Sequence, residues 1–266
     1  MRLVPISVAA LLIASLSVLA NSGGTEDQGK QTVDQALEAL GGDHFLNMHT
    51  RISSGRLYSF FRDQISGAEV AHIYTEYPST VDKGSLAVIE RQVLGKKQDY
   101  SYLFLGKAGW DITFRGARQV EDETWNRYAR TTENDILYIL KVRKDEPGWM
   151  YDFIGSQVYL SRHVDIVDLN DSQNRTVRVY FDHNTKLPVR EVFSWLDPTT
   201  KYRNDEITEY DKYRDIGGGV MWPYTIERTR NGYKAFQMFA DSVQANGTVP
   251  PKTFELPAGA KILRSQ

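Results

Sequence analysis

The second half of the chain is a succession of short alternating segments joined by very short turns, and this pattern constrains the fold most. Residues 177–181 and 189–195 place large apolar side chains at alternate positions, with a turn between them at residues 182–185. A period of two indicates strands with one buried face. Glycine-rich turns at residues 217–219 and 231–232 separate the strands that follow. Turns this short join antiparallel neighbours, so the pattern predicts an antiparallel meander.

The first half carries the same signal, interrupted by helical segments. The segments expected as strands are residues 52–61, 70–77, 86–94, 100–105, 110–114, 158–166, 177–181, 189–195, 207–213, 220–228 and 233–243. Helical spacing predicts a helix that ends at Gly41-Gly42, and another over residues 121–145 with a possible break at Asn134-Asp135. We find no internal repeat or linker, so residues 31–266 are expected to form a single domain.

The N-terminus has the pattern of a secretory signal peptide. Residues 1–20 are rich in Leu, Val and Ala, and Arg2 is their one charged residue. Such a run with small residues at its end predicts export and cleavage after Ala20, with cleavage after Ser22 as an alternative. An uncleaved membrane anchor is the competing interpretation. Residues 21–30 are polar and glycine-rich, and they are expected to be a flexible leader.

Cysteine content and charge exclude several classes of protein. The chain has no cysteine, which excludes disulfides, thiolate metal sites, a cysteine nucleophile and a lipid-modified cysteine anchor. We therefore expect no stable membrane anchor in the mature chain. The formal net charge is -2, whereas nucleic-acid binding proteins usually carry a basic surface. A nucleic-acid partner is not expected.

Three segments resemble the outer-membrane lipoprotein-sorting superfamily, LolA/LolB-like. Residues 213–224 (YRDIGGGVMWPY) resemble the Tyr-x-Asp-hydrophobic-Gly-Gly turn of these proteins, and residues 179–190 (VYFDHNTKLPVR) resemble their Asp-x-x-Thr-x-x-Pro hairpin. Residues 249–260 (VPPKTFELPAGA) resemble their closing Phe-x-hydrophobic-Pro-x-Gly segment. The resemblance implies a mainly β (α+β) fold, in which about eleven antiparallel strands form a strongly curved, unclosed barrel with helices in its concave side.

The resemblance also implies a function in the bacterial periplasm. Members of the superfamily carry lipoprotein acyl chains or other lipids, and related domains sense envelope stress through protein partners. We therefore expect a soluble periplasmic carrier or binder of a lipid, a lipoprotein acyl chain or another hydrophobic ligand. A sensing or interaction module with an envelope protein partner is the alternative.

The apolar face of the segment 121–145 supplies the candidate ligand residues. Its members at helical spacing are Trp125, Tyr128, Ile136, Ile139 and Leu140. This stripe is either the lid of an apolar cavity or part of the ordinary core, and the sequence leaves both interpretations open.

Arg162 is a candidate polar group of the cavity. It has the strand parity of Val158, Leu160, Val164 and Ile166, so it would point toward an apolar face. A buried arginine needs an anionic partner, such as a lipid headgroup or a closing hydrogen-bond network. Alternatively, Arg162 reaches solvent at the sheet edge, or a bulge reverses its direction.

No pattern of catalytic residues is present in the sequence. The five histidines include no pair at i, i+4, and zincin, nucleophile-elbow and Walker motifs are absent. We expect no metal, no other cofactor and no enzyme activity. A cleft hydrolase with two distant carboxylates remains as a remote alternative. The mixed charges of residues 201–214 are interpreted as a solvated strand face.

Overall fold

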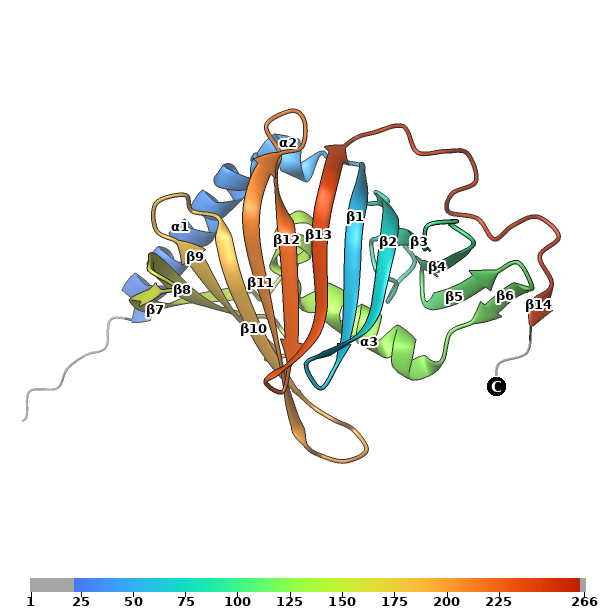
Figure 1. The fold of residues 1–266 in the computed structure, drawn as a ribbon. Helices are drawn as coiled ribbons and strands as arrows, with labels where there is room; N and C mark the ends of the chain where they lie inside the picture. Colours follow the sequence, from blue (N-terminus) through green and yellow to red (C-terminus); the bar gives the residue numbers. More distant parts are fainter. Residues whose placement is uncertain (1–21, 264–266) are drawn as a thin grey trace, which may run out of the picture.

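A computed structural model describes residues 22–263, and fourteen strands of this part form one strongly curved sheet (Figure 1). The order across the sheet is β14-β6-β5-β4-β3-β2-β1-β13-β12-β11-β10-β9-β8-β7. The strands are β1 (Thr50–Phe61), β2 (Gln64–Glu76), β3 (Ile89–Leu94), β4 (Tyr100–Leu105), β5 (Ala108–Thr113), β6 (Gly116–Gln119), β7 (Met150–Tyr159), β8 (Arg162–Asn170), β9 (Thr176–Asp182), β10 (Pro188–Leu196), β11 (Arg203–Asp215), β12 (Met221–Arg230), β13 (Tyr233–Ala245) and β14 (Ile262–Leu263).

The curved antiparallel sheet predicted from the sequence is confirmed. Neighbouring strands pair antiparallel throughout, except where the two-residue strand β14 pairs parallel with β6. Strands β7 and β14 are the two edges, so the barrel stays unclosed. The count is fourteen rather than about eleven because β6, β7 and β14 were not recognised as separate strands.

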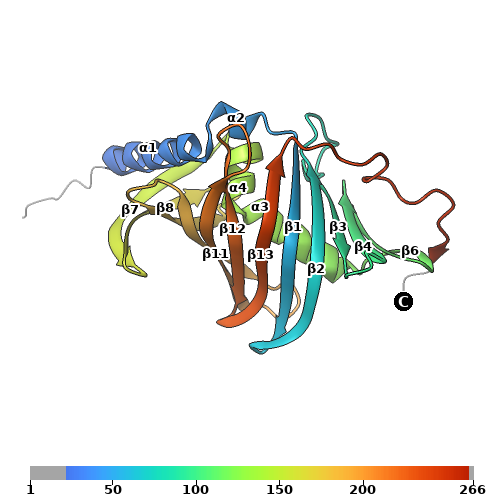
Figure 2. The same cartoon turned by 45° about the horizontal axis from the view of Figure 1, so that its top comes forward.

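The helices lie on the concave side of this sheet (Figures 1 and 2). They are α1 (Ser22–Leu40), α2 (Asp43–Leu46), α3 (Asp122–Asn134), α4 (Ile136–Tyr138) and the short π-helix η1 (Ile139–Arg143). Between residues 22 and 263, no helix has both the length and the apolar character needed to cross a membrane. The predicted signal peptide, residues 1–20, lies outside the described residues.

Helix α1 starts earlier than the sequence suggested, so the expectation of a flexible leader does not hold for residues 22–30. The N-terminal half of α1 packs against the edge strand β7. A Cβ atom at Gly29 would lie 2.2 Å from the carbonyl oxygen of Tyr151. The glycine that suggested flexibility therefore allows the helix backbone to approach the strand closely.

The predicted break between two helices at Asn134-Asp135 is confirmed. Asp135 has an extended backbone, with φ −67° and ψ 124°. Its carboxylate accepts hydrogen bonds from the backbone N–H groups of Leu137 and Tyr138, at 2.9 and 3.3 Å. Asp135 is thus the N-cap of α4. The bend separates α3 from the buried turns of α4 and η1.

The main core and the helices α1, α2, α4 and η1 occupy one half of the concave side. Its centre is a large cluster in which α1, α2, α4 and η1 pack against strands β8–β12. Buried members include Leu40, Phe45, Ile136, Leu140, Val167, Leu169, Val179, Phe181, Phe193 and Trp222. The half of the sheet formed by β1–β6 carries only smaller clusters and is covered by α3. This uneven filling leaves space between α3 and the sheet.

Candidate functional site

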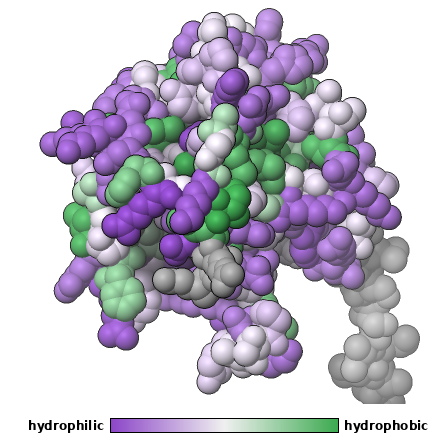
Figure 3. Space-filling model, turned by 90° about the vertical axis from the view of Figure 1, so that its right-hand side faces the viewer, coloured by the Kyte–Doolittle hydropathy of each residue, from purple (hydrophilic) through white to green (hydrophobic). Residues whose placement is uncertain are grey.

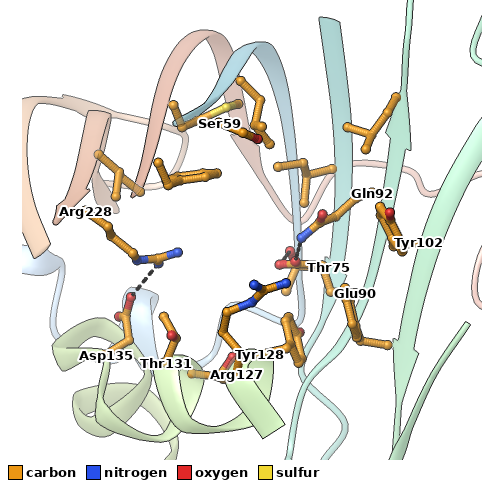
Figure 4. A pocket seen from close by; sticks show the side chains of 18 of the residues that line it. Ser59, Thr75, Glu90, Gln92, Tyr102, Arg127, Tyr128, Thr131, Asp135 and Arg228 are labelled. Carbon is orange, nitrogen blue, oxygen red and sulfur yellow. Dashed lines mark hydrogen bonds and ion pairs between the residues drawn. The ribbon is translucent and has the colours of Figure 1, made fainter. Parts of the chain in front are cut away.

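A cavity of about 940 Å³ lies between α3 and the concave face of the sheet. Strands β1–β4 and β11–β13 supply most of its walls, and α3 with the start of α4 closes one side (Figure 4). Ligand pockets usually measure roughly 300–1,000 Å³, so this cavity is large enough for a lipid-sized molecule. Figure 3 shows the side of the molecule that carries β5, β6 and β14, where most side chains are hydrophilic and hydrophobic ones show between them.

Apolar side chains form much of the wall. Most of them come from alternate positions on neighbouring strands, so they face the same side of the sheet; Val88 precedes β3, and Leu137 belongs to α4. These residues are Leu57, Ile73, Val88, Leu94, Phe104, Leu137, Ile226, Phe236, Met238, Ala240 and Val243. Burial of each methylene against such a surface contributes about 0.8 kcal/mol. The wall can therefore hold an alkyl chain by burial alone.

A cluster of polar side chains from β1, β2 and β3 interrupts the apolar wall. The Glu90 carboxylate accepts a hydrogen bond from the Gln92 amide at 2.7 Å and from the Thr75 hydroxyl at 3.4 Å. Arg51 donates to the Thr75 hydroxyl at 2.9 Å and lies 3.8 Å from Glu90. Arg51 also stacks on the ring of Trp222, with 4.2 Å to the ring centroid. These groups pair with one another, although the Nε of Arg51 is buried without a hydrogen-bond partner among the described residues.

Polar contacts join the C-terminal half of α3 to strands β11 and β12. The Thr131 hydroxyl donates to Glu206 at 2.7 Å, and Arg230 donates to the same carboxylate at 3.1 Å. Arg228 lies 3.7 Å from the Asp135 carboxylate (Figure 4). The helix is thus held over the cavity by a few polar links.

Aromatic rings hold the N-terminal half of α3 against β4. The rings of Phe104 and Tyr128 are parallel, with centroids 3.8 Å apart, and Trp125 lies 6.4 Å from Phe104. Burial raises the pKa of Tyr128 well above its usual value. Tyr128 therefore stays neutral at physiological pH. The helix rests on a flat aromatic contact at this end.

A fully buried carboxyl group lies beneath the helix junction. Glu191 on β10 is 0% exposed, and its Oε2 accepts a hydrogen bond from the backbone N–H of Ile136 at 2.7 Å. Its Oε1 has no hydrogen-bond partner among the described residues. Burial, followed by the charge of Asp135, raises the pKa of Glu191 well above its usual value. Burial therefore favours the neutral form of this carboxyl group, which accepts a hydrogen bond from the first turn of α4.

The expected stripe of residues 121–145 is divided between two places. Tyr128 lines the cavity, and Trp125 packs beside it against Phe104. Ile136, Ile139 and Leu140 instead lie in the main core, away from the cavity. The bend at Asp135 causes this separation. The lid interpretation thus applies to α3 alone, and the core interpretation applies to α4 and η1.

Arg162 does not reach the cavity, so that expectation is corrected. It does share a face with Val164 and Ile166, but this cluster lies apart from the helix-covered core. Arg162 begins β8 with a side chain that is 45% exposed, and it donates to Asp211 at 3.0 Å. Strand parity was right for Val164 and Ile166 but wrong for Val158, which pairs with His163, and for Leu160, which lies in the turn. The assignment of the buried face to the cavity was also wrong.

The mixed charges of residues 201–214 conceal buried residues that the sequence analysis missed, and one of them, Glu206, lines the cavity. Alternate residues of β11 point toward the helices. Glu206 is 1% exposed, and Thr208 and Tyr210 are also buried. The expectation of a solvated face is therefore wrong for this side of the strand. The signal was present as a period-two series of large polar residues.

Two serine–histidine arrangements have no catalytic geometry. The Asp165 carboxylate accepts from Ser156 at 2.6 Å and contacts Nδ1 of His183 at 2.8 Å. The carboxylate, not the imidazole, therefore contacts the hydroxyl, unlike in a serine hydrolase. Ser54 and His72 are 2.9 Å apart, but neither lines the cavity. Among residues 22–263, no group of three His, Cys, Asp or Glu side chains is arranged to hold a metal ion.

The comparisons with known proteins concern the fold. The structure of a DUF1329 family protein from Desulfovibrio piger aligns with this chain with a TM-score of 0.59 at 11% sequence identity. The alignment covers 86% of this chain and 98% of that one. A putative outer membrane lipoprotein-sorting protein domain from Vibrio parahaemolyticus aligns with a TM-score of 0.56 at 8% identity, covering 85% and 97%. No family model and no curated protein matches the sequence. The chain therefore has the LolA-like, lipoprotein-sorting fold that the sequence motifs predicted.

Proposed function

We propose that this chain is a non-catalytic carrier that holds a lipid or another molecule with an alkyl chain between α3 and the curved sheet. The observation that supports it is the cavity of about 940 Å³, whose wall combines a continuous set of apolar side chains with polar and charged ones. The predicted signal peptide supports a periplasmic location.

Helix α3 is the proposed lid. It contacts the sheet through an aromatic stack at one end and polar links at the other, whereas the main core excludes it. Each polar link contributes about 1 kcal/mol. Small contributions of this size allow a helix to move without unfolding the core. An entering alkyl chain would replace its contacts with the apolar wall.

A displacement assay tests the proposal. The neutral fluorescent probe N-phenyl-1-naphthylamine should bind the purified protein, and palmitate should displace it. Ser59 lines the cavity on β1, whereas its neighbour Tyr58 does not. We expect Ser59→Trp to weaken probe binding at least about tenfold and Tyr58→Trp to leave it unchanged, because successive strand residues face opposite sides. Absence of probe binding, together with absence of lipid in native mass spectra of protein from the envelope, would overturn the proposal.

An interaction module on the same fold is the second candidate. Exposed apolar side chains at hairpin ends favour it, since Phe61 and Phe114 are 68% and 86% exposed. Solvent-exposed aromatic residues of this kind are enriched at protein interfaces. Pull-down from envelope extract should then recover one stoichiometric partner, and Phe61→Ser should abolish the recovery. Retention of the partner by this variant would exclude the hairpin as its site.

A further inference from the structure

We infer that the ligand of this cavity carries an anionic headgroup, a carboxylate or a phosphate, which Arg228 and Arg127 bind. The inference rests on the proposed function and specifies the chemical class of the molecule carried. Figure 4 shows both guanidinium groups directed into the cavity, one from β12 and the other from α3.

Arg228 is the stronger element of this site. None of its guanidinium nitrogens donates a hydrogen bond to any of residues 22–263, and its Nε is buried without a partner. Its nearest anion is the Asp135 carboxylate, at 3.7 Å. The guanidinium also lies 5.2 Å from the ring of Phe236. The charge group is therefore enclosed and oriented, yet its donors are unused.

Asp135 cannot supply the missing acceptors while it caps α4. One of its oxygens already accepts the N–H groups of Leu137 and Tyr138. The other oxygen is beyond hydrogen-bond distance from Arg228. Guanidinium groups bind planar carboxylates and phosphates through two parallel hydrogen bonds. A ligand anion in the cavity would satisfy donors that the protein leaves open.

Arg228 remains charged in this environment. Burial lowers its pKa, but Glu206 and Asp135 raise it, and the net direction is upward. A permanent positive charge that lacks hydrogen-bond acceptors is costly to enclose. Binding of a negatively charged ligand group next to Arg228 is therefore favoured over binding of a purely apolar ligand.

Arg127 provides a second free guanidinium. It projects from α3 toward the cavity and makes no hydrogen bond or ion pair within residues 22–263. The other cavity arginines differ. Arg51 uses Thr75 and Glu90, and Arg230 uses Glu206. Arg118 on β6 also lines the cavity, and its Nε has no hydrogen-bond partner among the described residues; it lies across from Asp111 in the β5–β6 pairing. We assign the headgroup to Arg127 and Arg228, because one comes from α3 and the other lies next to Asp135 at the helix junction.

The cavity carboxylates near these arginines do not offer a competing cation site. Glu206 accepts from Thr131 and Arg230, and Glu90 accepts from Gln92 and Thr75. Asp135 is the helix cap described above. Each of these carboxylates is already paired, so an added cation would have to break existing bonds. An added anion would break none of the bonds of Arg127 or Arg228.

Ligands with one chain length and different headgroups test the inference. Palmitate, hexadecanol and palmitoyl lysophosphatidic acid are compared as competitors of N-phenyl-1-naphthylamine at pH 8, below their critical micelle concentrations. We expect palmitate or the phosphate to compete at least about tenfold better than hexadecanol. The stronger of the two anions identifies the headgroup as carboxylate or phosphate.

Variants assign the preference to the two arginines. Arg228→Gln and Arg127→Gln should each reduce the ratio of the affinity for the anion to the affinity for hexadecanol at least about threefold. Arg228→Lys keeps the charge without the bidentate geometry, and it should retain part of the preference. Arg162→Gln, outside the cavity, is the control and should have no effect. Arg127 is exposed on α3, so its variant remains informative if Arg228→Gln fails to fold.

Two outcomes separate this inference from the proposed function. Equal competition by palmitate and hexadecanol, or a preference that both glutamine variants retain, would overturn the anionic headgroup but leave lipid binding intact. Failure of all three ligands to displace the probe would instead overturn the proposed function itself.

Discussion

Glu191 provides a direct test of how the junction between α3 and α4 is stabilised. Its side chain is 0% exposed, and the backbone N–H of Ile136 donates to it at 2.7 Å. Burial raises its pKa well above the usual value, so the folded protein holds a proton there. Replacement by glutamine keeps an oxygen for the Ile136 N–H and removes the titration. Glu191→Gln therefore isolates the free-energy cost of keeping the carboxyl group neutral.

The magnitude follows from proton linkage. Above a pH of about 4.3 the unfolded chain releases the proton of Glu191, whereas the folded chain retains it until its raised pKa is reached. The folded state binds more protons in this window, so its stability falls as pH rises. The slope is up to about 1.4 kcal/mol per pH unit for one fully linked proton. The glutamine variant lacks this loss, and its advantage should grow with pH.

Urea unfolding at pH 4.5, 5.5, 6.5 and 7.5 measures this difference. We expect the stability of Glu191→Gln relative to wild type to rise at each step until the pH passes the pKa of the folded state. Glu38→Gln, at an exposed position on α1, is the matched control and should change by only a few tenths of a kcal/mol. If the difference in unfolding free energy between wild type and Glu191→Gln stays constant across this pH range, the carboxyl group is not held neutral by burial and the reasoning fails.

Two further predictions concern contacts of the helices. Thr131→Val removes the 2.7 Å hydrogen bond to Glu206. The free energy of unfolding should fall by about 1 kcal/mol, and amide hydrogen exchange in α3 should become faster. Unchanged exchange would refute the idea that this hydrogen bond restrains α3. Lys141 donates to the carbonyl oxygens of Phe45 and Leu46, and burial lowers its pKa to about 8. Because the unfolded chain keeps this proton to a higher pH, the stability should rise between pH 8 and 9.5 in wild type relative to Lys141→Met. Thermal unfolding across this range measures the effect, and identical pH profiles would contradict it.

Local signals were sufficient for much of the fold. The turn at residues 182–185 forms because Asp182 accepts hydrogen bonds from the backbone N–H groups of Asn184 and Thr185. Asp135 ends one helix and caps the next in the same local way. Such side-chain contacts to nearby backbone depend on a few adjacent residues. They can therefore be predicted without knowledge of the tertiary structure.

The hairpin between β7 and β8 shows where this approach fails. Its turn residues, Leu160 and Ser161, have φ values of 46° and 63°. Left-handed conformations are unusual for residues of these types, and no glycine, asparagine or proline marks the turn. The alternation of apolar residues continues through it, so one long strand was predicted instead of two. Tertiary pairing of β7 with β8 overrides the local preference.

The cavity polar groups could not be found from local pattern for a different reason. Glu191, Glu206, Arg228 and Asp135 belong to four separate elements, and their proximity follows from the pairing of β10, β11 and β12 beneath the helix junction. In the sequence, each charged residue resembles an exposed one. Their burial depends on the curvature of the whole sheet. A period-two series of polar residues becomes informative only once the inner face is known.

The division of the concave side connects the fold to the proposed function. On one half, α1, α4 and η1 fill the curve of the sheet with large apolar side chains, and no residue of α3 belongs to this cluster. On the other half, α3 spans the remaining curve and touches the sheet through the ring of Tyr128 and the Thr131–Glu206 link. A single packed core would leave no room for a ligand, and an uncovered sheet would expose its apolar face to water. Under the proposed function, separate packing of the two halves would let one stabilise the protein while the other exchanges a ligand.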